Sequence, residues 1–305
     1  MKILVTGGAG FIGSHLVDTL IKEKHQVLVI DDLSYGKKEN INKKADFEKI
    51  DIRDKKLKNI FKNFKPEIVF HLAAQKNVRL SVEDPGFDAD VNIIGTLNLL
   101  ENCRLYKSKF VFSSTGGAIY GDTDQVPTPE GHEEKPVCPY GIAKLSIEKY
   151  LYYYEKQYKL PWVSLRYANV YGPRQDPKGE AGVVAIFATM MLNNEQPVIN
   201  GDGQQTRDYV YVDDVVKANL FSIPKEVKGI YNVGTSQETS VNQLFNKMVE
   251  IGEFDFEEKH GPALPGEQQK SNLSYQKIKN DLNWQPKVDL DEGLKRTLDW
   301  FRENV

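Results

Sequence analysis

The sequence predicts an α/β protein, with a doubly wound parallel sheet and a second, smaller α/β lobe. In the first half of the chain, short apolar segments alternate with segments of helical period, which is typical of a parallel sheet covered by helices on both faces. After about residue 170, glycines and prolines separate shorter elements, which indicates a second lobe. At 305 residues the chain is long enough for both.

Five strands are predicted in the first lobe. Each is short and mostly apolar, as expected for a strand that helices cover on both faces. They span Lys2–Thr6, Gln26–Asp31, Ile68–Leu72, Phe110–Ser113 and Trp162–Arg166. Because parallel strands end at the same edge of a sheet, their carboxyl ends should together form the edge where ligands bind.

Three helices are predicted from apolar and aromatic residues that recur at three- and four-residue steps. They span Gly13–Lys22, Phe87–Leu105 and Pro139–Tyr158, and the last two could also pair with a second subunit. Asp208–Asn219 resembles a return of the chain to the first lobe. We therefore expect interleaved domains, with residues 1–168 plus about 208–233 in the first and about 169–207 plus 234–305 in the second.

Composition and charge disfavour several classes of protein. The 43 acidic and 40 basic residues leave a formal charge of −3, with no basic block of the kind that binds nucleic acid. Cys103 and Cys138 lack metal-ligand spacing and are too few for a disulfide framework, so we expect a cytoplasmic protein without a metal site. No apolar run reaches the length of a membrane span, so no membrane partner is expected.

A glycine-rich loop predicts a dinucleotide site. Gly7, Gly10 and Gly13 follow a strand and open a helix, where the backbone can approach a pyrophosphate. A glycine turn that serves only packing is the alternative. Asp31 ends the next strand at the position of a ribose-binding carboxylate, which would repel the 2′-phosphate of NADP. We therefore expect NAD. Lys37 and Lys38, a few residues later, are the features that would favour NADP.

Tyr140 and Lys144 predict a redox active site. Residues four apart share one face of a helix, so the Lys144 ammonium can lie beside the Tyr140 phenol. That ammonium and a positive nicotinamide both favour the phenolate, which could then remove a proton from a hydroxyl group. Ser113, Ser114 and Thr115 end the preceding strand, and one of their hydroxyls could hold the reacting oxygen. A hydroxyl-capped turn is the alternative.

The chain resembles the extended short-chain dehydrogenase/reductases of the NAD-dependent epimerase/dehydratase family, and among them bacterial and archaeal UDP-glucose 4-epimerases. The resemblance covers nearly the whole length. Its matching segments are TGGAGFIGSHL, DDLSYGKKENI, DIRD, HLAAQKNVRLSVEDP, VNIIGTLNLLE, SSTGGAIYG, YGIAK, LRYANVYGPRQDP, GDGQQTRDYVYVDDVV and YNVGT. It implies that the first domain is a Rossmann-type NAD-binding domain and the second a nucleotide-sugar-binding domain, in a homodimer formed through a four-helix bundle.

The resemblance also implies a reaction. Hydride leaves carbon 4 of a UDP-sugar for a tightly held NAD, and the transient 4-keto sugar turns and takes the hydride back on its other face. Tyr140 would be the base and Lys144 its electrostatic partner. Thr115 would assist, with Ser114 as the second choice.

A larger set of binding residues is expected. The NAD contacts would be Gly7, Gly10, Phe11, Ile12, Gly13, Asp31, Asp51, Ile52, Leu72, Ala73, Ala74, Lys76, Asn92, Ser113, Tyr140, Lys144 and Tyr167. Asp51-Ile52 could flank the adenine, and Leu72-Ala73-Ala74 end a strand where the backbone can pass close to the dinucleotide, with ordinary packing as the alternative for each. The resemblance itself implies Asp51, Ile52, Lys76, Asn92 and Tyr167, and it also implies the substrate contacts. The substrate contacts would be Asn169 and Arg207 near the diphosphate, Glu267 at the uridine ribose, and Ser271 near the sugar.

Three positions depart from the family pattern or bear on specificity. Leu264 stands where an arginine clamp for the diphosphate is common, and Lys270 could replace it. An extra glycine in Gly116-Gly117 blurs which hydroxyl meets the substrate. Ser271 stands where a bulky tyrosine in some members crowds the sugar 2-position. We therefore expect an enzyme that interconverts UDP-GlcNAc and UDP-GalNAc as well as UDP-glucose and UDP-galactose.

Other functions on the same scaffold stay open. A UDP-glucuronate 4-epimerase would retain nearly all of these motifs. A net NAD-dependent nucleotide-sugar oxidoreductase would release its cofactor in every cycle, and a non-catalytic NAD-binding sensor would keep the fold without the chemistry. A 4,6-dehydratase is disfavoured, because Gly116-Gly117 stand where its acid-base pair would be. The tyrosines of Pro139–Tyr158 are expected in the core or at a subunit interface.

Overall fold

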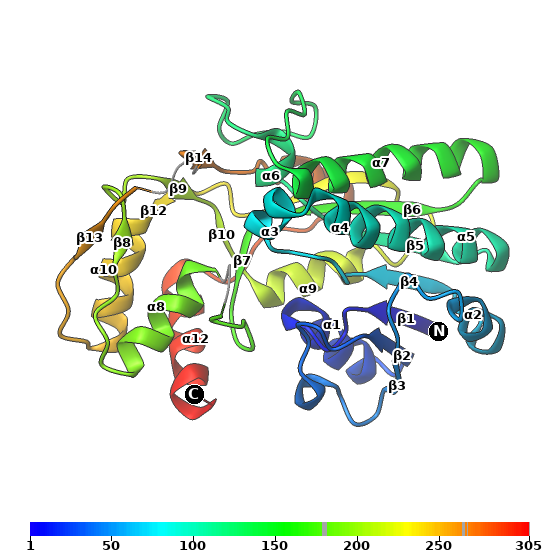
Figure 1. The fold of residues 1–305 in the computed structure, drawn as a ribbon, viewed down its shortest axis with the longest axis horizontal. Coiled ribbons are helices and arrows are strands. Elements are labelled where there is room, and N and C mark those ends of the chain that lie inside the picture. Colours follow the sequence, from blue (N-terminus) through cyan, green and yellow to red (C-terminus); the bar gives the residue numbers. More distant parts are fainter. Residues whose placement is uncertain (179–181, 264–265, 267, 305) are drawn as a thin grey trace. The chain divides into compact units, whose positions relative to one another are not determined.

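The computed structural model describes residues 1–178, 182–263, 266 and 268–304 (Figure 1). The chain divides into two compact units. The first unit comprises Met1–Ile119, Pro136–Arg166 and Val216–Tyr231, and the second comprises Tyr120–Lys135, Tyr167–Val215 and Asn232–Val305. The domain boundaries expected from the sequence concern which parts bind NAD and nucleotide, and they stay a prediction.

The main sheet has seven strands in the order β11-β6-β5-β4-β1-β2-β3. They are β1 Lys2–Thr6, β2 Gln26–Asp31, β3 Asp46–Lys49, β4 Ile68–His71, β5 Lys109–Thr115, β6 Trp162–Tyr167 and β11 Gly229–Val233. The pairs from β3 across to β5 are parallel, and Thr6 at the end of β1 lies opposite both Ile30 and His71. The strand order reverses beside β1, and ligands bind at such a switch point. The predicted doubly wound fold is confirmed.

Helices connect the strands of this sheet. They are α1 Phe11–Lys22, α2 Leu57–Phe64, α3 Val78–Glu83, α4 Pro85–Ala89, α5 Thr96–Tyr106, α6 Gly117–Tyr120, α7 Pro139–Tyr158 and α9 Val212–Phe221, with a 3-10 turn at Lys38–Asn40 and a π turn at Asp90–Gly95. The helix predicted over Phe87–Leu105 is therefore interrupted by the π turn. Helix α5 packs against both α2 and α7, and Figure 1 shows α5 and α7 side by side.

The core of the first unit anchors α7 to the sheet. Ile147 and Leu151 of α7 are fully buried in one cluster with Phe110 and Phe112 of β5 and Leu99 of α5. Burying one such side chain contributes about 1.5–3 kcal/mol. The helix that begins beside Tyr140 is thus fixed to the strand that ends at Thr115.

The second unit contains three small sheets. Their strands are β7 Asn169–Tyr171 with β10 Tyr209–Tyr211; β12 Thr239–Ser240, β9 Thr206–Arg207 and β14 Lys270–Ser271; and β13 His260–Gly261 with β8 Ile199–Asn200. Its helices are α8 Val183–Leu192, α10 Val241–Gly252, α11 Gln276–Leu282 and α12 Leu290–Asn304. Helices α8, α10 and α12 pack on one another, and a capping box of Ser240 and Gln243 starts α10.

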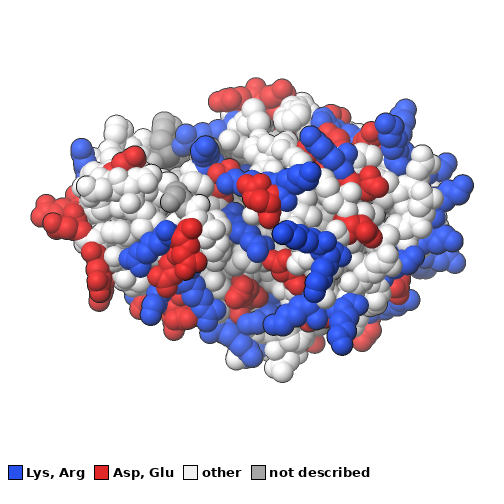
Figure 2. Space-filling view, turned by 90° about the horizontal axis from the view of Figure 1, so that it is seen from below, with Lys and Arg blue, Asp and Glu red and all other residues white. Residues whose placement is uncertain are grey.

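Hydropathy and charge are both mixed along the described residues. In this part of the chain no helix combines the length and the apolar character that crossing a membrane requires. Side chains of both signs are interspersed over the face in Figure 2. The two cysteines, Cys103 and Cys138, are buried, and neither forms a disulfide.

Candidate active site

The glycine loop joins β1 to α1 in a conformation that few other residues could adopt. Gly7 has a φ of +70°, and a Cβ on it would lie 2.6 Å from the Ala73 nitrogen. A Cβ on Gly13 would lie 2.1 Å from the Gly7 carbonyl oxygen. Helix α1 begins at Phe11, and the first N–H groups of a helix have no intrahelical acceptor. The loop therefore brings bare backbone and a helix N-terminus together, which suits a pyrophosphate.

Asp31 ends β2 beside this loop and is 8% exposed. Its Oδ2 accepts a hydrogen bond from the Ala9 nitrogen (3.0 Å), and its Oδ1 accepts one from the Leu33 nitrogen (2.9 Å). Burial raises the pKa of Asp31, and these two bonds oppose that rise. A Cβ on Gly36 would lie 2.8 Å from Oδ1, so there is little space around this negatively charged side chain. Such a site favours ribose hydroxyls over a 2′-phosphate.

A buried hydrogen-bond chain supports the segment that follows β4. Thr96 Oγ1 donates to the Asn92 carbonyl (2.7 Å), so it accepts from His71 Nε2 (2.8 Å). His71 Nδ1 then accepts from Thr6 Oγ1 (2.7 Å), which in turn accepts from the Ala73 nitrogen (3.3 Å). Burial keeps the pKa of His71 well below its usual range, so the ring is neutral. His71 is thus a local hydrogen-bonding residue.

The π turn places a second polar cluster beside that segment. Asn92 accepts from the Gln75 nitrogen (3.0 Å) and donates to the Gln75 carbonyl and to Asp88 Oδ1 (2.9 Å each). Gln75 Nε2 also donates to Asp88 Oδ1 (2.9 Å), whereas the buried Asp88 Oδ2 has no hydrogen-bond partner among the described residues. The Lys76 ammonium lies 5.6 Å from the centre of the Tyr35 ring. Asn92 and Gln75 therefore fix the backbone that leads to Lys76.

Asp51 and Ile52 follow strand β3 in the same unit. Arg53 donates to both carboxylate oxygens of Asp51, at 2.6 to 3.1 Å, and holds the pKa of that carboxyl below its usual range. Ile52 is 5% exposed and fills the space next to Gly95, where a Cβ would lie 2.8 Å from its side chain. The sequence did not single out Arg53, which sets the orientation of Asp51.

Helix α7 brings Tyr140 and Lys144 to the carboxyl end of β5. Lys144 is 3% exposed, and its Nζ donates to the Ser113 carbonyl (2.8 Å) and lies 5.7 Å from the centre of the Tyr140 ring. Burial lowers the pKa of Lys144 to about 8, and the carboxylates of Asp88 and Glu148 oppose that change. The four-residue spacing thus places the ammonium beside the phenol, as predicted.

The phenol itself differs from the expectation. Burial raises the pKa of Tyr140, and the nearby Asp88 and Cys138 add to the rise. In the chain alone, desolvation and these two neighbours therefore disfavour the phenolate. The positive charge of a bound nicotinamide would favour it.

The hydroxyls at the end of β5 have different surroundings. Ser114 is 4% exposed and donates to Glu148 Oε1 (2.8 Å), which also accepts from Ser164 Oγ (2.8 Å). Arg166 forms a buried ion pair with the same carboxylate. Thr115, the next residue, ends the strand and is partly exposed. The Ser114 hydroxyl is thus used inside the protein, and sequence reasoning missed Glu148, although it lies four residues after Lys144 on the same helix.

The second unit holds the other predicted contacts. Tyr167 ends β6 and is 6% exposed, and Asn169 is an exposed residue at the start of β7. Arg207 of β9 pairs in register with Ser271 of β14, which is 6% exposed. The predicted contact Glu267 and the departure at Leu264 lie outside the described residues.

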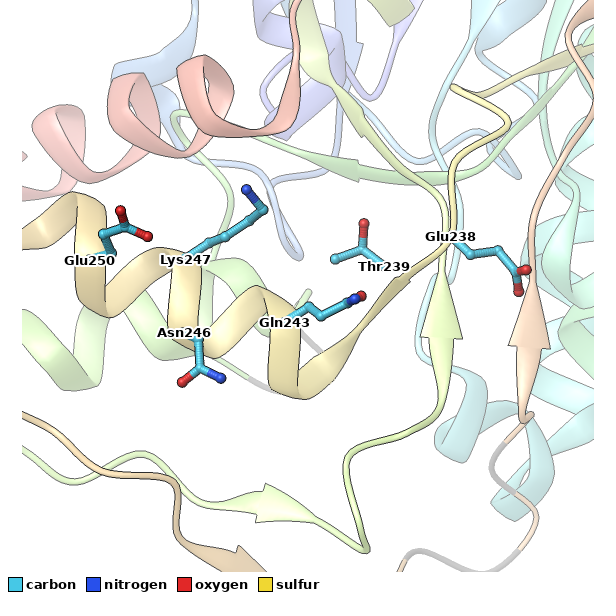
Figure 3. Close-up of a pocket in the computed structure, with 6 residues that line it drawn as sticks. All are labelled: Glu238, Thr239, Gln243, Asn246, Lys247 and Glu250. Carbon is cyan, nitrogen blue, oxygen red and sulfur yellow. The ribbon is translucent and has the colours of Figure 1, made fainter.

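A shallow pocket lies elsewhere in the second unit, on α10 (Figure 3). Gln243, Asn246, Lys247 and Glu250 extend from the helix, Thr239 from strand β12 before it, and Glu238 from the position that precedes the strand. None of these residues belongs to the predicted site. The pocket has no catalytic set, so the candidate active site is the first-unit cluster of the glycine loop, Asp31, Tyr140 and Lys144.

Comparison with known proteins identifies the family. A model of the NAD dependent epimerase/dehydratase family matches residues 3–234. The chain belongs to this family. Membership confirms the predicted enzyme class and NAD as the cofactor, and the glycine loop, Asp31 and Lys144 fit that cofactor. The predicted Rossmann-type fold is confirmed by the solved structures described next.

Several individual proteins are similar over nearly the whole chain. A protein named putative UDP-glucose 4-epimerase from Methanocaldococcus jannaschii is 50% identical, over 99% of each chain. Solved structures include a UDP-glucose 4-epimerase with UDP-glucose from Thermotoga maritima (54% identity, TM-score 0.98, 99% of each chain). A Thermus thermophilus UDP-glucose 4-epimerase with NAD follows (45%, 0.95, 100% of each). A UDP-N-acetylglucosamine 4-epimerase from Methanobrevibacter ruminantium is 37% identical (TM-score 0.95; 100% and 99% covered).

Proposed function

We propose that this protein is an NAD-dependent 4-epimerase of UDP-hexoses that acts through a transient 4-keto sugar. The main support is the Tyr140 and Lys144 pair at the carboxyl end of β5, in the unit that holds the glycine loop and Asp31. Similarity to UDP-glucose 4-epimerases over 99% of the chain adds to it. The pair and this similarity support a net oxidoreductase or a non-catalytic sensor less directly.

Each residue of the pair has a defined task in this proposal. Bound NAD supplies a hydride acceptor that can return the hydride. Tyr140 takes the proton of the sugar 4-hydroxyl and gives it back after the sugar has turned. Lys144, held by the Ser113 carbonyl, keeps a positive charge near the phenolate. The Thr115 hydroxyl holds the reacting oxygen, because Ser114 donates to Glu148 instead.

The second-unit residues hold the rest of the substrate. A sugar that turns between two hydride transfers needs an anchor outside the sugar ring, and the nucleotide diphosphate supplies it. Arg207 and Asn169 are assigned to that diphosphate, since charge-assisted hydrogen bonds from arginine suit it. Glu267 is assigned to the uridine ribose by resemblance alone.

The first experiment tests reaction and substrate together. The purified protein is incubated separately with UDP-glucose, UDP-GlcNAc and UDP-glucuronate without added reductant, and the products are identified by proton NMR. A galacto-configured product establishes 4-epimerisation, and the substrate that yields it sets the specificity. A product from UDP-glucuronate alone would favour the hexuronate alternative. Release of free NADH during turnover would favour a net oxidoreductase.

Acceptance of N-acetyl sugars is the finer part of the proposal and depends on Ser271. A serine leaves more room than the tyrosine found in some members of the family. Ser271→Tyr should therefore suppress turnover of UDP-GlcNAc while UDP-glucose is still converted. An equal loss of turnover with both substrates, or a wild-type protein that does not convert UDP-GlcNAc, would contradict this assignment.

We also propose a cytoplasmic homodimer formed through a four-helix bundle of α5 and α7 from each subunit. The support is a set of exposed apolar and aromatic residues on these helices: Leu105, Ile142, Tyr150, Tyr152, Tyr153 and Tyr158. Exposed apolar and aromatic side chains on neighbouring helices are typical of an interface. Cys103 and Cys138 are buried and form no disulfide, which agrees with a reducing compartment.

A further inference from the structure

Asp208 occupies the junction between two small sheets of the second unit. It is the single residue between β9 and β10. Its backbone nitrogen donates to the Ser271 carbonyl of β14 (2.9 Å), and its own carbonyl accepts from the Asn169 nitrogen of β7 (2.9 Å). Arg207 directly precedes it. One residue therefore connects the three strands on which Asn169, Arg207 and Ser271 lie.

The Asp208 carboxylate is enclosed by donors from two other segments. Its Oδ1 accepts from the Thr235 nitrogen (2.8 Å) and the Thr235 hydroxyl (2.6 Å). Its Oδ2 accepts from the nitrogens of Ser236 and Leu273 (3.2 Å each). Leu273 lies two residues after Ser271, so the carboxylate also ties the segment that follows β14 to the 235–236 turn.

Gly234, which has no side chain, leaves space for the Asp208 carboxylate. Asp208 is fully buried, and a Cβ on Gly234 would lie 2.4 Å from its Oδ2. Burial raises the pKa of Asp208 to about 6, while the donors from Thr235, Leu273 and Ser236 oppose the rise. At neutral pH the group is therefore charged and can accept all four bonds. A buried carboxylate would repel a diphosphate, so a contact with the ligand is not its role.

We propose that Asp208 is a positioning residue that sets the relative placement of Asn169, Arg207 and Ser271 for a nucleoside diphosphate sugar. The proposal rests on the proposed function, which assigns these three residues to the UDP-sugar. Loss of the carboxylate would leave buried donors of Thr235, Ser236 and Leu273 without a partner, so the 235–236 turn and the segment after β14 would no longer be held against the junction that carries Asn169, Arg207 and Ser271. The expected effect is weaker nucleotide binding with little change in NAD retention.

The test uses UDP as the probe and isothermal titration calorimetry on the NAD-containing protein. Asp208→Asn removes the charge, and Asp214→Asn is the matched control. Asp214 is equally buried in the same unit, but its Oδ2 accepts from the Lys287 and Val288 nitrogens (2.9 Å each). Thr235→Val, a milder variant in case Asp208→Asn does not fold, removes only the hydroxyl donor, and Thr235→Ser restores it.

The proposal predicts a graded loss of UDP affinity. Asp208→Asn should weaken binding about tenfold and Thr235→Val about threefold, whereas Thr235→Ser and Asp214→Asn should stay within about twofold of wild type. In turnover, the KM for the UDP-sugar should rise while kcat changes little. Wild-type affinity in both Asp208→Asn and Thr235→Val, or an equal loss in Asp214→Asn, would overturn the proposal. A wild-type protein that fails to bind UDP would overturn the proposed function, and the positioning role with it.

Discussion

At the scale of single residues, the site depends on which polar groups the protein already uses. Ser114 and Thr115 are adjacent hydroxyl residues, but only Ser114 donates to the buried Glu148. Lys144 and Tyr140 are both desolvated, which opposes charge on each of them. A positive nicotinamide changes that balance for the phenol, because it attracts a phenolate.

Tyr140→Phe should remove turnover and leave NAD binding nearly intact. The phenol is the proposed base, and loss of a general base lowers kcat by roughly 10²- to 10⁴-fold. Turnover of UDP-glucose is followed by NMR, and retained NAD by its release on denaturation. Tyr154→Phe is the control, since Tyr154 lies on the same helix and its hydroxyl donates to Glu101 (2.5 Å). Turnover near the wild-type level in Tyr140→Phe would exclude this residue as the base.

Thr115→Val and Ser114→Ala should have different effects. Thr115→Val removes the hydroxyl assigned to the reacting oxygen, so kcat should fall roughly 100-fold. Ser114→Ala removes one of several bonds to Glu148, so it should cost about 1 kcal/mol of unfolding free energy and leave kcat within a few-fold. Steady-state kinetics and urea unfolding measure the two quantities. The reverse pattern would make Ser114 the contacting residue.

At the scale of elements, the sequence predicted the helices and strands whose buried apolar residues form a regular pattern. The starts of β1, β2, β4 and β6 and the whole of α7 match the predicted ranges. Strand β3 was missed because its segment, Asp46–Lys49, is polar and mostly exposed, without the apolar run of a central strand. The break of the predicted Phe87–Leu105 helix coincides with two hydrogen bonds of Asn92 to the Gln75 backbone, a tertiary contact that helical periodicity does not encode.

The candidate site shows the same division. Gly7, Asp31 and the Tyr140 and Lys144 pair follow from local spacing, because each acts within one turn or one helix. Asp88 and Arg166 could not be found this way. They act across elements, on Gln75 and on Glu148, and only the fold brings these groups together.

Asp88→Asn should move the pH profile of kcat to lower pH. Helix α4, which holds Asp88, packs against α7, and the carboxylate raises the pKa of both Tyr140 and Lys144. The other titratable groups near the pair are Glu148 and His71 at Lys144 and Cys138 at Tyr140. Asparagine can keep the bonds to Gln75 and Asn92 without the charge.

The sign of this shift follows from the charge. Removing a negative group makes the phenolate easier to form and the ammonium easier to lose. Both limbs of the profile therefore move down, by roughly half a pH unit to one unit. The control is Asp84→Asn, which removes a charge at the N-cap of the same helix, where asparagine caps equally well. An unchanged profile in Asp88→Asn would show that its carboxylate is only structural.

At the scale of the whole molecule, one surface feature is unexplained by the folded chain alone. In the described residues, large apolar side chains on α5 and α7 are left uncovered although the same helices bury their opposite faces in the core: Leu105 is 55% exposed and Tyr152 57%. Arg104 stacks on Tyr158 (4.8 Å), and the Tyr153 and Tyr158 hydroxyls are 3.3 Å apart. Aromatic and arginine side chains of this kind are enriched at the centres of protein interfaces.

Tyr150→Glu combined with Tyr153→Glu should therefore separate the subunits. Two carboxylates per chain would be desolvated against a second copy of the same face, where they would also repel each other. Analytical ultracentrifugation should give a mass about half that of the wild type, because the dimer would separate into monomers. The effect should be strong, since a C2 interface carries each change twice. Val198→Glu, at a 41% exposed apolar residue of the second unit, is the control and should keep the wild-type mass. A wild-type protein that sediments as a monomer, or a double variant of unchanged mass, would contradict the four-helix-bundle dimer.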